Sequence, residues 1–190
     1  TFVCVVSLGI GMAPVIAIPY VSRLSRMPPA GVNTERLVEL VTTRVGPHEE
    51  TAQWSYPDYL DLRDADTGMT LIGWTGGQSA ITFQAAGGPK TFASTLFVPR
   101  HYFKTLGVAL ARGAGFDDAV DGQLNAEPVV ILGYRFWQNR LAADPDIVGK
   151  TLTMDGVPHV VVGIAPDQFD GHVGFSGREL FVPLAQHPNK

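Results

Sequence analysis

The pattern of apolar and polar residues is clearest between residues 127 and 169, where it first predicts a strand followed by a helix. Residues 128–132 form a short apolar run that ends at Gly133, which is typical of a buried strand. In residues 134–141 the apolar side chains follow near-helical spacing and leave the polar ones free to face water. The pattern therefore predicts a buried strand that leads into an amphipathic helix.

The second part of this stretch predicts a β-hairpin. Residues 151–154 and 159–164 have strand-like composition and flank the dipeptide Asp155-Gly156. This dipeptide suits a type I′ turn, in which both central residues need a positive φ, and we expect Gly156 to adopt one. Because proline cannot donate a hydrogen bond, Pro158 is expected at the start or the edge of its strand. Strand, helix and hairpin together indicate an α+β unit.

The remaining elements are predicted from shorter patterns. Ser55-x-x-Asp58 has the form of a helix start, with Pro57 tolerated in the first turn. A second short helix is expected over residues 99–106, ended by Gly107 in a left-handed conformation. Further strands are predicted at residues 36–43, 69–74, 80–85, 90–98 and 180–184, of which the three between residues 69 and 98 have the pattern of an antiparallel meander.

The amino-terminal 22 residues contain no charged side chain. A helix of that length would span about 30 Å, the thickness of a bilayer core, so we predict a transmembrane helix over residues 1–26 and a proline-containing linker over residues 27–35. A buried globular helix and a signal peptide are the alternatives, and neither explains so long an uncharged run as well. Arg23 and Arg26 follow the run, and the positive-inside rule alone would place that end in the cytoplasm. The sequence begins without Met, which we interpret as a piece of a longer protein.

The central stretch also carries a family resemblance, since its motif W-Q-x-R-L-x-x-D-P-x-I-V-G-K-T-L-T-x-D-G-x-P is followed by V-V-G-I-x-P-x-x-F. This pattern resembles the MacB-like periplasmic core domain of bacterial FtsX-type ABC transporter permeases. The resemblance continues upstream through Ser55-Tyr56-Pro57-Asp58-Tyr59 and Tyr102-Phe103, and so covers nearly the whole chain. The residues that match in the central stretch are Trp137, Arg140, Asp144, Pro145, Ile147, Val148, Gly149, Leu152, Gly156, Val161, Val162, Gly163, Pro166 and Phe169.

The resemblance implies an extracytoplasmic mixed α/β domain in two parts. Residues 36–98 would form the first half of a ferredoxin-like Porter subdomain, and residues 99–190 a Sabre-like insert. The second half of Porter and three further membrane helices would follow residue 190. The chain departs from the family pattern at Pro99 and His101, where Ser-x-Asn is usual, and at Gly113-Ala114-Gly115-Phe116, where Gly-Arg-x-Phe is frequent.

The function that the resemblance implies is that of a non-catalytic permease subunit. Its outer domain would couple ATP-driven motion of the membrane helices to a substrate or a partner protein, from the periplasmic side of the bacterial inner membrane. The implied partners are an ABC ATPase subunit or domain, further membrane helices of the same permease, a second permease copy and a periplasmic protein. Because the positive-inside rule conflicts with this orientation, the orientation rests on the resemblance.

Composition and motifs limit the ligands and reactions that we expect for this chain. The net charge of −4 disfavours nucleic-acid binding, and Cys4, the only cysteine, allows neither an internal disulfide nor a cysteine-based metal site. The five histidines show no metal-binding spacing, and no phosphate-binding loop is present, so we expect no metal, cofactor or catalytic residue. The alternative is a membrane-anchored binding module, or an enzyme with a site around Asp170, His172 and Ser176. These three residues lie in the glycine-rich segment 167–179, which is more typical of a mobile surface loop.

Overall fold

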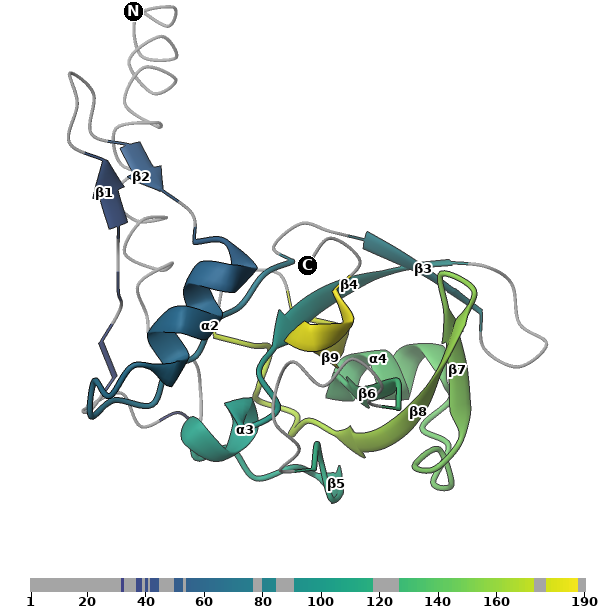
Figure 1. Ribbon diagram of the computed structural model, residues 1–190. Coiled ribbons are helices and arrows are strands. Elements are labelled where there is room, and N and C mark those ends of the chain that lie inside the picture. The colour runs from purple at the N-terminus through teal and green to yellow at the C-terminus, as the bar shows by residue number, and fades with distance from the viewer. Residues whose placement is uncertain are drawn as a thin grey trace, which may run out of the picture.

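The computed structural model describes residues 32, 37–38, 40, 42–44, 50–52, 54–76, 80–84, 91–117, 127–172 and 177–187 (Figure 1). Its main element is a mixed seven-stranded sheet with the order β5-β8-β6-β9-β4-β3-β7. The strands are β3 (Ala80–Gln84), β4 (Thr91–Val98), β5 (Arg112–Gly113), β6 (Val129–Leu132), β7 (Thr151–Met154), β8 (Val157–Ile164) and β9 (Leu180–Pro183). A separate hairpin pairs β1 (Thr42–Arg44) with β2 (Glu50–Ala52).

The sheet closes on itself through β7. This strand pairs with β3 on one side and with β8 on the other, both antiparallel, so that β8, β6, β9, β4, β3 and β7 form a ring. Within the ring, β4 is parallel to β9 and β6 is parallel to β8. The predicted hairpin is confirmed, because Asp155 and Gly156 join β7 to β8 with φ values of 48° and 83°. A ring leaves few unpaired strand edges and resists bending, which favours a rigid body.

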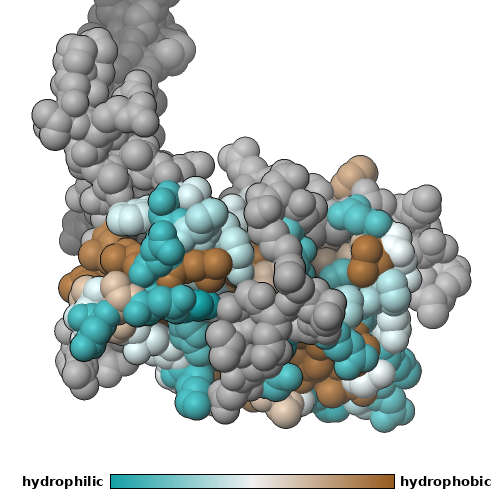
Figure 2. All heavy atoms as spheres, viewed as in Figure 1, coloured by the Kyte–Doolittle hydropathy of each residue, from teal (hydrophilic) through white to brown (hydrophobic). Residues whose placement is uncertain are grey.

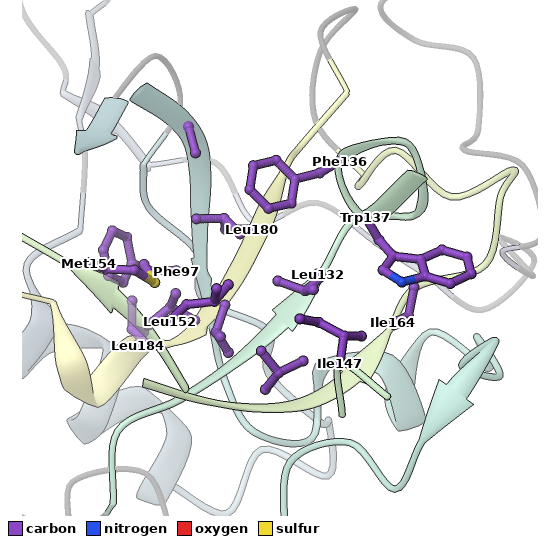
Figure 3. Close-up of a cluster of buried hydrophobic side chains, with 14 of the residues drawn as sticks. Phe97, Leu132, Phe136, Trp137, Ile147, Leu152, Met154, Ile164, Leu180 and Leu184 are labelled. Carbon is purple, nitrogen blue, oxygen red and sulfur yellow. The ribbon is translucent and has the colours of Figure 1, made fainter. Parts of the chain in front are cut away.

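Side-chain alternation along the central strands builds two hydrophobic cores. Leu132, Leu180 and Phe97 contribute to a first cluster, which α4 (Tyr134–Arg140) covers with Phe136 and Trp137 (Figure 3). The residues between them along the strands point to the opposite face and build a second cluster, together with the short helix α3 (Tyr102–Thr105). The second cluster contains Leu96, Val98, Ile131 and Phe181 from the strands and Tyr102, Phe103 and Leu106 from the α3 region. Since β6 and β9 are buried on both faces, they show the continuous apolar runs by which the sequence identifies them.

The predicted helix start at Ser55 is confirmed. Helix α2 (Tyr56–Asp64) begins with a capping box. The Ser55 hydroxyl accepts a hydrogen bond from the Asp58 amide, and the Asp58 carboxylate accepts one from the Ser55 amide. The hydrogen bond from the Ser55 hydroxyl holds the pKa of Asp58 below its usual value. Tyr59 is the buried residue of this helix and belongs to the first cluster. A 3-10 turn, η1 (Leu184–Gln186), follows β9.

One predicted strand is wrong, and another is confirmed only at its end. Residues 69–74 form no strand, and only Thr75 makes an isolated bridge, to Phe97. Here the chain packs against α2, where Gly73 lies so close to the Tyr59 ring that a Cβ would overlap it. In the predicted strand of residues 36–43, Thr42 and Thr43 belong to β1, whereas Leu37, Val38 and Leu40 are exposed and lie outside any strand. Figure 2 shows hydrophobic residues gathered over the α2 side of the molecule.

Other predictions are corrected in detail. Of the predicted meander, the antiparallel pairing of β3 with β4 is confirmed, but residues 69–74 supply no first strand. The strand β4 also pairs in parallel with β9, far away in the sequence. The helix predicted over residues 99–106 is shorter, since a turn precedes Tyr102, while Gly107 has the expected positive φ of 69°. The strands β2 and β5 were not predicted, since segments of two or three residues carry no periodicity.

The sequence predicts a membrane helix, a linker and a domain in two parts, and the structure describes only some of these residues. Within the described residues, no helix is both long enough and apolar enough to cross a membrane. The predicted membrane helix of residues 1–26 lies outside the described residues, as does all of the linker of residues 27–35 except Val32. The seven-stranded sheet contains strands from both sides of the predicted division between residues 98 and 99. The assignment to Porter-like and Sabre-like parts stays a prediction.

Candidate functional site

The three residues considered for a catalytic site have separate surroundings. The Asp170 carboxylate forms an exposed ion pair with Arg135, with Oδ2 3.3 Å from Nη1, and its backbone carbonyl accepts a hydrogen bond from the Arg178 amide. His172 makes its side-chain hydrogen bond with Tyr102 instead. Ser176 lies outside the described residues. The geometry of Asp170 and His172 therefore supplies no carboxylate–imidazole pair of the kind that activates a nucleophile.

His172 and Tyr102 form a partly buried polar pair, with Tyr102 Oη 2.6 Å from His172 Nδ1. Tyr102 is fully buried in the second cluster, and the edge of Trp74 packs on the imidazole at a centroid distance of 5.4 Å. Burial lowers the pKa of His172 to about 4, and the positive charge of Arg178 adds to this effect. Burial likewise raises the pKa of Tyr102 well above its usual value. At neutral pH both groups are therefore uncharged, and they share the hydrogen bond between Oη and Nδ1.

The lowered pKa of His172 predicts a loss of stability in acid. The unfolded chain takes up a proton on this histidine below about pH 6.5, whereas the folded chain does so only below about pH 4. Protonation thus favours the unfolded state, and the free energy of unfolding should fall by about 2–3 kcal/mol from this group as the pH drops from about 6.5 to 4. Urea titrations at pH 7 and pH 4.5 should show a smaller acid loss for His172→Gln than for the wild type. Equal losses for the two proteins would contradict the burial of an uncharged imidazole.

A second polar network joins β4, α4 and the segment before β9. The Ser94 amide donates to Glu179 Oε2 at 2.8 Å, and the Glu179 amide donates to the Ser94 carbonyl at 3.0 Å. Arg178 Nη1 donates to Ser94 Oγ, and burial lowers the pKa of this arginine. Arg140, at the end of α4, reaches Glu179 Oε1 at 3.3 Å and the Phe92 carbonyl at 3.2 Å. These contacts hold the end of α4 on the sheet, so they position backbone rather than a substrate.

The motif that carries the family resemblance is also structural. The Trp137 indole N–H donates to the Asp144 carbonyl at 2.9 Å, and Ile147 is buried behind the same loop. The Asp144 carboxylate accepts hydrogen bonds from the Asp146 amide and the Lys150 ammonium. The hydrogen bond from Lys150 lowers the pKa of Asp144. Gly149 has a φ of 90° and donates its amide to the Val161 carbonyl. The motif therefore closes the α4–β7 loop and fixes it on β8.

The other described histidines have packing roles. His101 Nε2 lies 3.0 Å from the Leu71 carbonyl oxygen, and His159 Nδ1 lies 2.9 Å from the Val157 carbonyl oxygen. Burial lowers the pKa of His159. His187 packs edge-on against Phe97, while His48 lies outside the described residues. Among the residues that the structure describes, no group of three His, Cys, Asp or Glu side chains could hold a metal ion.

Sequence reasoning missed Tyr102 and Arg178 as the residues that surround His172. Tyr102 lies 70 positions before its partner, and its neighbourhood reads only as a short apolar helix. Arg178 sits in a glycine-rich segment where an arginine is typical of an exposed loop, yet it is buried. No local pattern connects these positions, because only the folded chain brings Tyr102 to His172.

Comparison with known proteins identifies a family and a fold. The model of the MacB-like periplasmic core domain matches residues 1–189. The fold is similar to the periplasmic region of MacB from Actinobacillus actinomycetemcomitans, with 17% identity, a TM-score of 0.54 and coverage of 86% of this chain and 65% of the other. It is similar to the extracellular domain of the noncanonic ABC-type transporter YknZ from Gram-positive bacteria, with 17% identity, a TM-score of 0.51 and coverage of 69% and 63%.

A third similar structure is a domain of a putative permease protein from Porphyromonas gingivalis, with 16% identity, a TM-score of 0.51 and coverage of 78% and 62%. No curated protein matches the sequence. The matched part of the three solved structures amounts to 62–65% of their length. At these identities the three likenesses concern the fold, and the family follows from the match over residues 1–189.

Proposed function

The chain belongs to the MacB-like periplasmic core domain family, and from this membership we propose that it forms the outer domain of a permease subunit in a bacterial ABC transport or efflux system. The observation that carries the proposal is the family match over residues 1–189, and the similar fold of the MacB and YknZ outer regions supports it. The domain then acts on the periplasmic side of the inner membrane, with residues 1–26 as its membrane helix.

The proposed partners follow from this role. An ABC ATPase, as a subunit or a domain, supplies the energy, and further membrane helices of the same permease transmit it. A second permease copy and a periplasmic protein complete the assembly. The hydrophobic residues on the α2 side in Figure 2 suit packing against other parts of such a permease, and so do the exposed side chains of Leu37, Val38 and Leu40.

We propose that the domain transmits motion as a rigid body. A ring of strands with a packed core on each face deforms little, so a push from the membrane helices would move it as a unit. The polar network of Ser94, Arg140, Arg178 and Glu179 adds cross-links between α4 and the sheet. The domain itself performs no bond chemistry in this proposal.

The alternatives are a tethered binding module without a motor, and an enzyme with a site around Asp170, His172 and Ser176. The enzyme receives little support, because the Asp170 carboxylate pairs with Arg135 while His172 pairs with Tyr102. The binding module differs from the permease in having no ATPase partner. Purification of the full-length permease from its native host separates the permease from the binding module, which has no ATPase partner. An assay of ATP hydrolysis with Asp170→Ala and His172→Ala as variants then tests whether these two residues take part in it. We expect an ATPase to copurify and its basal hydrolysis to be unchanged in both variants.

A test of rigid-body transmission needs no knowledge of the cargo. One spin label at the exposed position 139 of α4 reports the distance between two permease copies, and a pair at positions 139 and 155 reports a distance inside one domain. Binding of a non-hydrolysable ATP analogue should change the first distance by several ångströms and leave the second unchanged. An unchanged distance between copies would support the tethered module, and a changed distance within the domain would rule out the rigid body.

A further inference from the structure

The structure contains a pocket that the proposed function does not use. It lies between α3 and the segment that follows β5, and its volume is about 490 Å³. This volume is within the range of about 300–1,000 Å³ that is usual for small-molecule sites. All the lining residues used below belong to the described part of the chain.

One wall of the pocket carries a buried positive charge. The Arg100 side chain is only 5% exposed, and its Nη1 lies 2.5 Å from Oδ1 of Asp117. A buried guanidinium is stable only when an anion compensates it. Asp117 provides that anion, yet its own side chain is 71% exposed. Because this carboxylate is already largely hydrated, it can leave the guanidinium at a much smaller cost than a buried carboxylate could.

The rest of the pocket is lined by apolar and basic side chains. The rings of Phe103 and Phe116 lie 6.3 Å apart, and Leu110 also lines the space. Lys104 adds a second cation, so the fixed charges of the described lining are two positive and one negative. An aromatic wall beside a guanidinium suits a molecule with a flat apolar body and an acidic group.

We propose that this pocket binds a small organic anion, in which a carboxylate or sulfonate is attached to an aromatic or alicyclic body. The acidic group of the ligand takes the place of Asp117 on Arg100, so the buried charge stays compensated during the exchange. The apolar body lies against the surface that Phe103, Phe116 and Leu110 contribute to the pocket. Asp117 is therefore an internal competitor of the ligand, and this role makes the proposal testable.

The probe is 1-naphthoate, with uncharged 1-naphthamide as its control, titrated into the full chain by calorimetry in one detergent buffer. Asp117→Asn removes the competitor and should tighten naphthoate binding by about threefold or more, whereas Arg100→Gln should weaken it by about tenfold or more. The amide should bind about tenfold more weakly than the acid. Binding of either probe to detergent is common to all variants and cancels in the comparison.

The chain offers a matched control pair at Arg63 and Asp64. This ion pair joins an arginine to a carboxylate that is 65% exposed, close to the value for Asp117, and it lies on α2 outside the pocket. Asp64→Asn should leave the affinity for naphthoate unchanged. Circular dichroism identifies any variant that fails to fold, and Asp117→Asn still decides if Arg100→Gln is lost. No binding of naphthoate, equal binding of acid and amide, or weaker binding by Asp117→Asn would overturn the proposal.

Discussion

Replacement of Trp137 by alanine should lower the free energy of unfolding by about 3–5 kcal/mol, which would be a large part of the stability of an ordinary domain. The indole is 7% exposed and packs against Tyr134 at a centroid distance of 5.4 Å, while Arg112 lies over its face at 5.4 Å. Its N–H donates to the Asp144 carbonyl. The substitution therefore leaves a cavity in the first cluster and removes the bond that closes the α4–β7 loop.

The chain provides an exposed tryptophan as the control. Trp54 is 49% exposed, so Trp54→Ala should change the free energy of unfolding by less than about 1 kcal/mol. Urea titrations followed by far-UV circular dichroism compare both variants with the wild type without depending on tryptophan emission. Losses of similar size for Trp54→Ala and Trp137→Ala would refute the packing described for α4.

The sequence predicted those elements whose formation depends on neighbouring residues. The Asp155-Gly156 turn, the capping box at Ser55 and the apolar run of β6 are all specified within a few positions, and the structure has each of them. The motif around Trp137 was long enough to identify the family, and the structure explains its spacing. Its tryptophan, aspartate and glycine serve one loop, because they contact one another or β8.

The features that escaped prediction depend on residues far apart in the chain. The parallel pairing of β4 with β9 joins Thr95 to Leu180, and nothing local specifies it. The Tyr102–His172 pair joins residues 70 positions apart, and the pocket at Arg100 is lined by α3 and by residues 108–117. Ala142 and Ala143 adopt φ values of 51° and 52°, which alanine rarely does, because the chain must turn sharply to return the Ala143 amide to the Trp137 carbonyl. In the candidate site, local sequence suggested Asp170 and His172 as partners, and only the fold separated them.

The junction between β6 and α4 should tolerate a side chain even less than a strained turn does. Gly133 has an ordinary φ of −66°, so its backbone would accept any residue. Its missing Cβ, however, would overlap the Arg178 carbonyl oxygen and lie 3.2 Å from that of Glu179. This backbone cannot shift freely, because the Gly133 amide donates to the Glu179 carbonyl and the Arg178 amide donates to Asp170. The space at Gly133 is therefore closed by main chain, which side-chain rearrangement cannot relieve.

Gly133→Ala should consequently lower the free energy of unfolding by about 3 kcal/mol or more, from overpacking together with a poorer residue at the start of α4. Gly156 provides the opposite case, since its φ is 83° but no atom lies within 4 Å of a Cβ placed there. Gly156→Ala should cost only about 1 kcal/mol, the usual penalty for a left-handed alanine. Urea titrations of the two variants separate steric closure from conformational strain. If Gly156→Ala lowers the free energy of unfolding more than Gly133→Ala does, the close approach of Gly133 to the Arg178–Glu179 backbone is wrong.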